Sequence, residues 1–488
     1  MVFNGLYADR PILALAGALK AHSRQAFQVT VRVFFLSVCC PPMSLNSLYD
    51  SLKQRLESGE WLGGQRMPSI RKLAASADVS YHDVVSAYAR LVSEGVLTAS
   101  PGRGYFVTGG ISHENPPNEP EWVAEDPLFK LLQAGPHYNK LGCGWLPPAW
   151  RDTELLAKAI RRTARLEQSS LAEYGDVSGY LPMRKQLCVH IKRLTRIDIR
   201  PGQVLTTLGA TQGLDLVARL LIRPGDHVFV DEPGNGNLIR LIQLAGGHVV
   251  GVRRTQDGPD IAEMESYLAK HTVKAFFCNS TFHNPTGSNI SPHNAFKVLR
   301  LAVEHEFYVV EDDVYGDFSP VVRQTFAELD NLERVIYVGS FSKCLSASLR
   351  VGYIACSQGL IEPLTRLKLL TCVAVPAFCE RFVNTILADG TYARHMQNVQ
   401  QRLIGQQVQT QRSLLERGWK FDMAPQGGMF IWAYHPDIPD LKPFMTKLEQ
   451  HNILLMPGSA FSVTRDYQRF ARINCTHFSD TVEEHFSV

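Results

Sequence analysis

A lysine set among hydroxyl side chains follows the apolar run of residues 335–338. Ser340, Ser342 and Lys343 form a Ser-x-Ser-Lys motif, and Arg350 comes seven residues after the lysine. Hydroxyl and guanidinium groups can hold a phosphate while a nearby amine attacks a carbonyl to form a Schiff base. Because the motif is short, an ordinary surface lysine remains the alternative when it is taken alone.

Two further motifs come at the ends of apolar runs that we predict to be strands. Asp312 and Tyr315 follow the run 307–310, and Asn284 belongs to an Asn-Pro-Thr-Gly turn after the run 275–278. Ligand contacts in α/β folds gather at the carboxyl ends of strands, where a carboxylate can keep a pyridine nitrogen protonated. The Asn284 amide could likewise donate to a phenolic oxygen. A helix cap and a plain turn are the alternatives.

A fourth motif, Gly-Ala-Thr-Gln, opens a predicted helix after the strand-like run 204–207 and contains Ala210 and Thr211. The free backbone N–H groups and the dipole at a helix N-terminus favour a phosphate. An ordinary helix start would look the same. All four motifs in this order and spacing nevertheless argue against coincidence.

With Arg472 in Ala-Arg-Ile-Asn, these motifs resemble the fold-type-I aminotransferases that depend on pyridoxal 5'-phosphate (PLP). The resemblance implies that Lys343 forms the internal aldimine and that Asp312 pairs with the pyridine nitrogen. It implies that Asn284 and Tyr315 bind the phenolic oxygen, and that Arg472 clamps a substrate or effector carboxylate. The phosphate would be held by Ala210, Thr211, Ser340, Ser342 and Arg350.

The likeness covers about residues 127–480 and departs from the family at one place. After the strand ending at Val230 the family reads Pro-x-Tyr, whose aromatic ring covers the cofactor, but this chain has Asn235 there. Losing that ring places efficient transamination more in doubt than cofactor binding. Phe282 or Tyr180 could supply a ring in its place.

Nearer the N-terminus, the sequence predicts three short helices and a hairpin, the layout of a winged helix-turn-helix. Ser69 and Ser80 precede two of the helices as N-caps, and residues 100–104 form a turn between two short strands. Residues 67–107 resemble the GntR family of bacterial DNA-binding domains, in which the third helix enters the major groove. The resemblance implies DNA contacts from Ser69, Arg71, Lys72, Ser80, Tyr81, His82 and Arg103.

This predicted DNA-binding domain departs from its family at two positions. Tyr81 stands where the family usually has arginine, and Asp83 stands where it usually has threonine. An acidic group at Asp83 repels phosphate unless the helix cap engages it. Residues 47–107 hold seven Lys and Arg against six Asp and Glu, so one module should bind DNA weakly. Useful affinity needs two modules, and Tyr174 matches a family segment that often reaches the partner subunit. We therefore expect a homodimer.

Composition agrees with a multidomain globular chain. The 488 residues are 45% hydrophobic and 20% charged with a net charge of +3, and no apolar run is long enough to span a membrane. The ten cysteines lack metal-ligand spacing and indicate reduced thiols, so we expect no metal site and a cytoplasmic location. The expected divisions are a doubtful N-terminal extension, a winged helix, a linker and an aminotransferase-like domain of two lobes, at 1–42, 43–107, 108–126 and 127–488.

A GntR-type winged helix joined by a linker to an aminotransferase-like domain resembles the MocR subfamily of bacterial transcription regulators. That resemblance implies a PLP-binding regulator that senses PLP or an amino compound, controls binding to operator DNA and associates with the nucleoid. It is not expected to act primarily as an enzyme. An active aminotransferase with a DNA-binding appendage remains the first alternative, and a repressor whose core holds no cofactor is the second.

Overall fold

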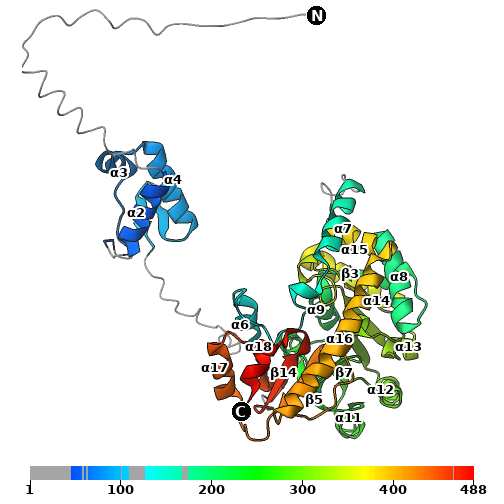
Figure 1. Ribbon diagram of the computed structural model, residues 1–488. Helices are drawn as coiled ribbons and strands as arrows, with labels where there is room; N and C mark the ends of the chain where they lie inside the picture. Colours follow the sequence, from blue (N-terminus) through cyan, green and yellow to red (C-terminus); the bar gives the residue numbers. More distant parts are fainter. Residues whose placement is uncertain are drawn as a thin grey trace, which may run out of the picture. The chain divides into compact units, whose positions relative to one another are not determined.

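The computed structural model describes residues 45–57, 60–61, 64–100, 102–108, 127–166, 174–464 and 466–487. The predicted extension 1–42 and all but the first residue of the predicted linker 108–126 lie outside these residues. The chain divides into two compact units, Met1–Pro120 and Glu121–Val488. Figure 1 labels helices of both units and some strands of the larger unit, and the two units are described separately below.

The smaller unit is a winged helix-turn-helix, as predicted. Its helices are α2 (Leu45–Glu57), α3 (Ile70–Ala77) and α4 (Tyr81–Ser93), and its wing is the antiparallel pair β1 (Leu97–Ser100) and β2 (Gly104–Val107). Apolar residues at helical spacing, among them Leu52, Leu73, Val84, Tyr88 and Leu91, form one buried core. Ser69 and Ser80 are the N-caps of α3 and α4, as their positions before the apolar stripes predicted.

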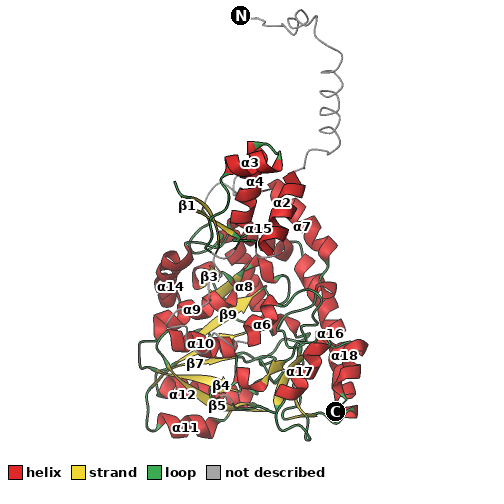
Figure 2. Cartoon of the chain, turned by 90° about the vertical axis from the view of Figure 1, so that its left-hand side faces the viewer, coloured by secondary structure: helices red, strands yellow, loops and turns green. Residues whose placement is uncertain are grey.

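The larger unit is built on an eight-stranded mixed sheet in the order β3-β10-β9-β8-β7-β4-β5-β6 (Figure 2). From β9 through β8, β7 and β4 to β5 the pairing is parallel, whereas β10 is antiparallel to both β3 and β9. Parallel neighbours bring their carboxyl ends to the same edge of the sheet. The strands are β3 (Val204–Thr207), β4 (His227–Glu232), β5 (His248–Thr255), β6 (Gly258–Pro259), β7 (Val273–Cys278), β8 (Tyr308–Asp312), β9 (Val335–Ser340) and β10 (Gly352–Ala355).

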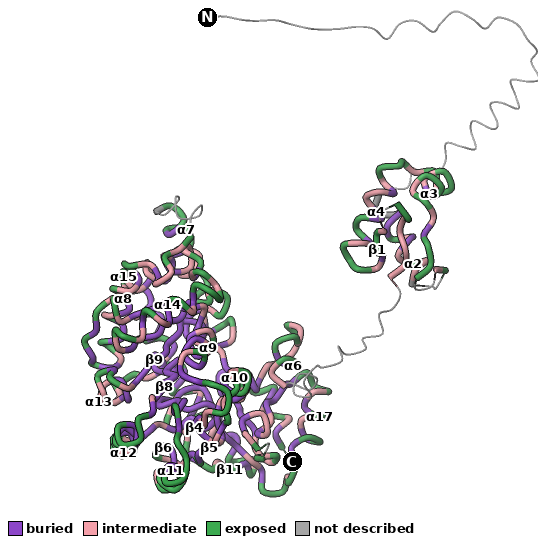
Figure 3. The backbone as a smooth tube through the Cα atoms, turned by 180° about the vertical axis from the view of Figure 1, so that it is seen from behind, coloured by how far each residue is buried: buried purple, intermediate pink, exposed green. Residues whose placement is uncertain are grey.

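Both faces of this sheet are buried, which explains why its strands read as continuous apolar runs. Along β4, Phe229 packs into one core, while its neighbours Val228 and Val230 pack into a second core. Figure 3 shows the buried strands inside a shell of more exposed helices. The helices of this lobe are α8 (Leu181–Thr195), α9 (Gly209–Leu221), α10 (Gly236–Leu244), α11 (Ile261–Leu268), α12 (Pro292–Glu304), α13 (Phe326–Asp330), α14 (Gln358–Cys372) and α15 (Ala377–Ala388).

A smaller antiparallel sheet forms the second lobe, in the order β11-β12-β14-β13. Its strands are β11 (Lys420–Phe421), β12 (Phe430–Tyr434), β13 (Met456–Pro457) and β14 (Phe470–Asn474). The remaining helices are α6 (Pro127–Gln133), α7 (Thr153–Leu166), α16 (Thr391–Glu416), α17 (Lys442–Gln450) and α18 (Asp480–Glu483). Among the described residues, no helix is long and apolar enough to cross a membrane.

Candidate functional site

Lys343 lies just beyond the carboxyl end of β9, next to the end of β8 that carries Asp312. A Cβ atom built on Gly144 would lie 3.7 Å from Lys343 Nζ and 3.4 Å from Tyr315 Oη. The amine and the phenol therefore approach the same point of the backbone. Sequence reasoning missed Gly144, because the segment from Leu141 to Leu146 carries no motif and only the folded chain brings it to the strand ends.

Asp312 is a buried carboxylate with an unused oxygen. The residue is 3% exposed, and its Oδ1 has no hydrogen-bond partner within the described parts of the chain. Burial raises the pKa of Asp312 to about 6, although hydrogen bonds from Asn279 and the Val314 backbone and the charge of Lys343 act in the opposite direction. A buried acceptor without a partner is uncommon in native proteins, so Asp312 is placed to receive an N–H group from a ligand.

Arg472 of β14 meets the predicted Asn284 turn inside the site. Its Nη1 donates to Asn284 Oδ1 at 2.6 Å, and its Nη2 donates to the carbonyl oxygen of Gly142 at 2.5 Å. The guanidinium stacks on Phe430 and Phe461, each with a ring centroid 4.7 Å away. This contact orients the Asn284 amide, whose nitrogen remains to donate to a ligand oxygen, and it holds a cation ready for a carboxylate.

The five residues expected to hold a phosphate are spread over three neighbouring segments. Ala210 and Thr211 are in the first turn of α9, and Arg350 Nη2 donates to the carbonyl oxygen of Leu208 at 3.0 Å. Thr211 and Arg350 both line a cavity of about 510 Å³. A helix N-terminus and a guanidinium at one cavity favour an anion.

Of the two serines before Lys343, Ser340 ends β9 and Ser342 follows that strand. Ser340 Oγ accepts from the backbone N–H of Ser342 at 3.1 Å, and it lies 3.3 Å from the carbonyl oxygen of Val351. The hydroxyl of Ser342 is buried and has no hydrogen-bond partner in the described residues. It is therefore available to a ligand oxygen.

The surroundings of Lys343 on balance disfavour its charged form, although Cys143 and Asp312 act in the opposite direction. Burial, and secondarily the positive charge of Arg472, lower the pKa of Lys343 to about 8. A lysine with a lowered pKa has a larger neutral fraction and is a better nucleophile toward a carbonyl. The unused Asp312 and Ser342 oxygens, the α9 N-terminus and this amine together fit a ligand that carries a basic ring nitrogen, a phosphate and an aldehyde, as PLP does.

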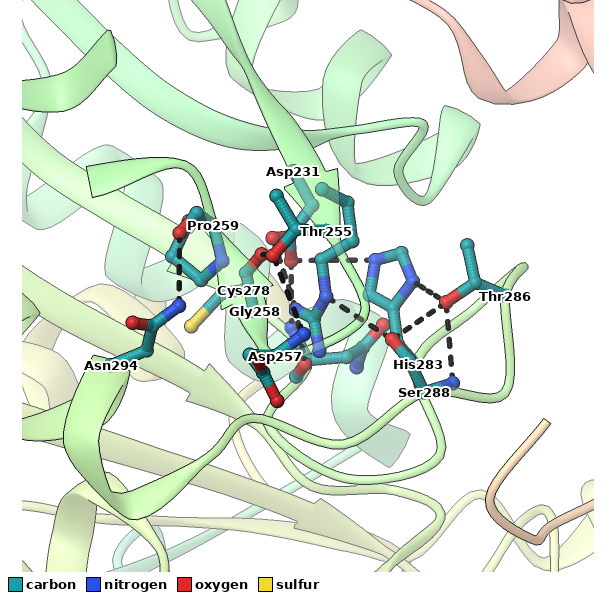
Figure 4. Close-up of polar contacts among 12 residues, drawn as sticks. Asp231, Thr255, Asp257, Gly258, Pro259, Cys278, His283, Thr286, Ser288 and Asn294 are labelled. Carbon is teal, nitrogen blue, oxygen red and sulfur yellow. Dashed lines mark hydrogen bonds and ion pairs between the residues drawn. The ribbon is translucent and has the colours of Figure 1, made fainter. Parts of the chain in front are cut away.

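A closed ring of buried hydrogen bonds holds the turn that carries Asn284 (Figure 4). Arg254 of β5 donates to Asp231 Oδ1 at 3.1 Å and to Ser288 Oγ at 3.3 Å. The Ser288 and Thr286 hydroxyls lie 2.9 Å apart, and Thr286 Oγ1 lies 2.9 Å from His283 Nδ1. His283 Nε2 closes the ring at 3.4 Å from Asp231 Oδ2.

The protonation state of His283 determines which groups donate and which accept in the hydrogen bonds of this ring. Burial, and then the charge of Arg254, lower the pKa of His283 to about 4, so the imidazole is neutral near pH 7. Its Nε2–H then donates to Asp231, and its Nδ1 accepts from Thr286. Because Asn284 directly follows His283, the ring fixes the turn from both sides of the asparagine.

Ser288→Ala breaks this ring at one point and leaves the buried Arg254 Nε–H without its acceptor, whereas the Thr286 hydroxyl keeps its contact with His283. We expect the variant to lower the free energy of unfolding of the larger unit by about 1–3 kcal/mol, the cost of buried groups left unpaired. Calorimetric unfolding measures the change. Ser348→Ala is the matched control, because that serine is exposed and hydrogen-bonded to Ser346. Equal stability of both variants would contradict the role given to the ring.

The departure at Asn235 has a structural role in the fold. Asn235 is the N-cap of α10, and its side chain accepts from the backbone N–H of Asn237 at 3.3 Å. Arg323 stacks on the Phe282 ring at 4.8 Å, and Arg381 stacks on the Tyr180 ring at 4.3 Å. That the Phe282 or Tyr180 ring covers the cofactor in place of the missing aromatic stays a prediction.

The residues expected to contact DNA all lie exposed on the smaller unit. Tyr81, at the start of α4, is 57% exposed. The others are Ser69, Arg71, Lys72, Ser80, His82 and Arg103. Sequence reasoning missed Arg66, which is exposed and whose Nε would lie 3.3 Å from a Cβ on Gly104 in the wing. Only the pairing of Arg66 with Phe106 brings this cation to the wing.

The helix cap engages the unusual acidic residue of the predicted recognition helix. Ser80 Oγ donates to Asp83 Oδ2 at 2.7 Å and accepts from the Asp83 backbone N–H at 3.1 Å. The carboxylate is thereby held at the N-terminus of α4, where the helix dipole favours a negative charge. It still places a negative charge on the surface expected to meet DNA.

Asp83→Asn removes that charge and retains an oxygen that can accept from Ser80. We expect DNA affinity to rise by up to about 1 kcal/mol per module, the range for exposed charge pairs, with the gain shrinking at high salt. Fluorescence anisotropy with labelled duplex DNA at two salt concentrations checks this. Asp50→Asn, on the exposed side of α2, is the charge-matched control and should leave affinity unchanged. An unchanged affinity for Asp83→Asn would show that the carboxylate does not face DNA.

Family models match both units of the chain. Residues 139–487 match the aminotransferase class I and II family, and residues 45–107 match the gntR family of bacterial regulatory proteins. The first match covers more than half of the chain and the second covers the winged helix. The two boundaries agree with the division into two units.

Relatives of both kinds align with the chain. The HTH-type transcriptional regulator YdfD of Bacillus subtilis is 25% identical over 84% of this chain and 88% of its own length. Aromatic-amino-acid aminotransferase 1 of Thermococcus litoralis is 27% identical over 72% of this chain and 86% of its own length. A solved kynurenine aminotransferase from Pyrococcus horikoshii is 26% identical, covers 76% of this chain and 93% of its own, and superposes with a TM-score of 0.69.

The regulator YdcR of Escherichia coli spans both units as well, with 24% identity over 88% of this chain and 94% of its own length. The chain therefore belongs to the aminotransferase class I and II family and joins to it a gntR-type regulatory domain, the arrangement of the MocR transcription regulators.

Proposed function

We propose that the chain is a PLP-binding transcription regulator in which the aminotransferase-like domain senses PLP or an amino compound and thereby controls binding to operator DNA. The observation that carries the proposal is the convergence of Lys343, Asp312, Asn284 and Arg472 at one buried site. The exposed start of α4 on the other unit supports the DNA-binding half. A bacterial regulator of this kind acts in the cytoplasm, at the nucleoid when bound to DNA.

Each residue of the site would have a separate task toward the cofactor. Bound PLP would supply an aldehyde and a ring that withdraws electrons. Lys343 would bind the aldehyde covalently, and Asp312 would hold the proton on the ring nitrogen. Asn284 and Tyr315 would donate to the phenolic oxygen, while the α9 N-terminus, Ser340, Ser342 and Arg350 would retain the phosphate. The solved Pyrococcus horikoshii relative was crystallised in complex with PMP.

An amino compound could regulate DNA binding only through unequal affinity for two arrangements of the protein. Exchange of the amine at Lys343 for that of an effector would free the lysine and bring a carboxylate to Arg472. Arg472 lies on β14 of the small lobe, whereas Asn284 and Lys343 lie on the large lobe. A carboxylate bound at Arg472 would therefore lie between the two lobes. Its contacts with both lobes would favour domain closure.

The same proposal includes a homodimer. Tyr174 is 89% exposed and Leu370 of α14 is 83% exposed. Large apolar side chains exposed in this way are typical of surfaces that pack against a partner. Paired winged helices would also raise the affinity for a two-fold symmetric operator. Analytical ultracentrifugation of the full chain and of Leu370→Glu tests it, with a shift toward monomer expected for the variant.

Covalent capture of PLP should follow the lowered pKa of Lys343. With a pKa of about 8, roughly a tenth of the amine is neutral at pH 7 and roughly nine tenths at pH 9. We expect the rate of capture to rise about tenfold between these pH values and then level off, because only the neutral amine attacks. Stopped-flow absorbance measures the rate. A rise that continues to pH 10 would contradict a lowered pKa.

Active transamination is the second candidate function. The complete set of Lys343, Asp312, Asn284 and Arg472 favours it, and Asn235 in place of the covering aromatic counts against it. Release of keto acids from amino-acid donors, measured with saturating PLP, separates the two functions. Turnover at rates typical of enzymes, about 1–10³ per second, would favour the transaminase, whereas ligand-dependent DNA footprints without such turnover would favour the regulator.

A further inference from the structure

A second cavity, of about 210 Å³, lies apart from the Lys343 site. It is lined by residues from the end of α8, from the segment that follows β8 and from α16. Its lining includes Arg193, Asp313, Arg323, Gln397 and Gln400. Asp313 directly follows Asp312 in the sequence, so the cavity borders the strand end that carries the proposed cofactor carboxylate.

Two oppositely charged groups in this cavity have unused hydrogen-bonding atoms. Asp313 is 5% exposed, and its Oδ2 accepts from Tyr337 Oη at 2.6 Å, while its buried Oδ1 has no hydrogen-bond partner among the described residues. Arg323 donates to Thr281 and, at 3.3 Å, to the carbonyl oxygen of Gly316, but its buried Nε has no hydrogen-bond partner in the part of the chain that the structure describes. Leaving such groups unpaired is costly, so the cavity needs both a donor and an acceptor from an occupant.

Two positive and two negative side chains line the cavity, and among them Asp313 and Arg323 attract each other electrostatically. Arg193, 47% exposed, reaches Asp317 Oδ1 at 3.4 Å, and the His190 ring lies 3.2 Å from the other oxygen of Asp317. Asp317 therefore has protein partners, whereas the described residues supply none to Asp313 Oδ1 or Arg323 Nε. A cation with an N–H group suits Asp313, and a carboxylate suits Arg323, with Arg193 at hand for its second oxygen.

We propose that this cavity is a second small-molecule site, which binds a small amino-acid zwitterion through its ammonium group at Asp313 and its carboxylate at Arg323. The volume is that of about seven water molecules, which suits a ligand of roughly seven to ten heavy atoms. Binding here is non-covalent and needs neither Lys343 nor PLP. The site is therefore distinct from the one proposed to capture the cofactor.

An occupant of this cavity would touch the supports of the cofactor site. Arg323 contacts Thr281 and stacks on Phe282, which lie three and two residues before Asn284, respectively. Asp313 lies between Asp312 and Tyr315 in the sequence. A zwitterion that bridges Asp313 and Arg323 would link the two segments that carry these residues. If PLP binds as proposed, each ligand must change the affinity of the other by the same factor.

The test uses N,N-dimethylglycine as the probe, because this tertiary amine has an N–H donor when protonated and cannot form an imine with PLP. Isothermal titration calorimetry of the full chain should show one site per chain. Trimethylglycine has the same charges but lacks the N–H group, so it should bind at least about tenfold more weakly, the loss of one charged hydrogen bond.

Variants separate this site from the Lys343 site. Binding of N,N-dimethylglycine should persist in Lys343→Ala and in Arg472→Gln, and it should weaken at least about tenfold in Arg323→Gln and Asp313→Asn. Gln397→Trp fills the cavity from an exposed position of α16 and should also abolish binding. Because Gln397 is exposed, this variant tests the site even if Arg323→Gln or Asp313→Asn fails to fold. Asn398→Trp, at the next exposed position of α16, is its control.

Two results would overturn the proposal. One is absence of N,N-dimethylglycine binding to the full chain. The other is binding that is lost in Arg472→Gln but retained in Gln397→Trp, because the probe would then occupy the Lys343 site. Neither result bears on PLP capture, which is measured separately by absorbance.

Discussion

Lys343→Ala should abolish the visible absorption that PLP gains when a lysine binds its aldehyde. The substitution removes the amine but leaves the α9 N-terminus, Ser342 and Arg350, so PLP should still bind non-covalently and more weakly. Addition of PLP to purified wild type and variant, followed by absorbance spectra, measures the effect. This is a loss of the whole signal and is the largest change that the account predicts.

Lys185→Ala is the matched control, because Lys185 is exposed on α8 and should leave the spectrum unchanged. A band that survives in Lys343→Ala would assign the covalent bond to another lysine. A wild type that gains no band with excess PLP would favour the alternative in which the aminotransferase-like domain holds no cofactor.

The double variant Arg71→Ala and Lys72→Ala should weaken DNA binding by about 100-fold in a dimer, because it removes four phosphate contacts. Each lost contact should also lower the slope of log affinity against log salt by about 0.9, giving a total change of about 3 to 4. The loss should be similar for operator and unrelated DNA, because these residues are expected to contact phosphates and not bases. Anisotropy titrations over a range of salt concentrations provide both numbers.

Arg366→Gln serves as the control for this experiment. Arg366 is exposed on α14 of the larger unit and is paired with Glu362, so its loss should alter neither affinity nor slope. A double variant whose salt slope matches that of wild type would show that α3 does not lie against the DNA backbone.

The sequence predicted the parts of the site that follow strands. Asp312 ends β8, Lys343 follows β9 and the Asn284 turn follows β7, and apolar runs with polar ends mark all three places. Neighbouring parallel strands then bring these residues together without further information. The winged helix was predictable for a similar reason, since Ser69 and Ser80 mark helix starts before apolar stripes of helical period.

Contacts between distant segments could not be predicted in this way. Asp231, Arg254 and His283 belong to different segments, and only the order of strands β7, β4 and β5 makes them one ring. The approach of Gly144 to Lys343 depends likewise on how the two lobes pack. A single sequence carries no signal for such pairings, because each residue alone resembles an ordinary charged, polar or turn residue.

At Asn235 the sequence and the structure each supply a different observation. The sequence indicated that the covering aromatic is missing, and the structure adds that Asn235 caps α10. Hydrogen bonding to the Asn237 backbone therefore accounts for an asparagine at this position. That Asn235 weakens the cofactor site stays a prediction, whereas its role as a helix cap required the backbone path.

The central claim, that the cofactor site controls DNA binding, is tested most directly by the operator affinity of the full chain with and without PLP. The operator is first mapped by footprinting, and its affinity is then measured for wild type and for Lys343→Ala. The account predicts that PLP, or PLP with an amino compound, changes the affinity or footprint of wild type and that Lys343→Ala loses this response. Identical affinities and footprints under all these conditions would contradict it.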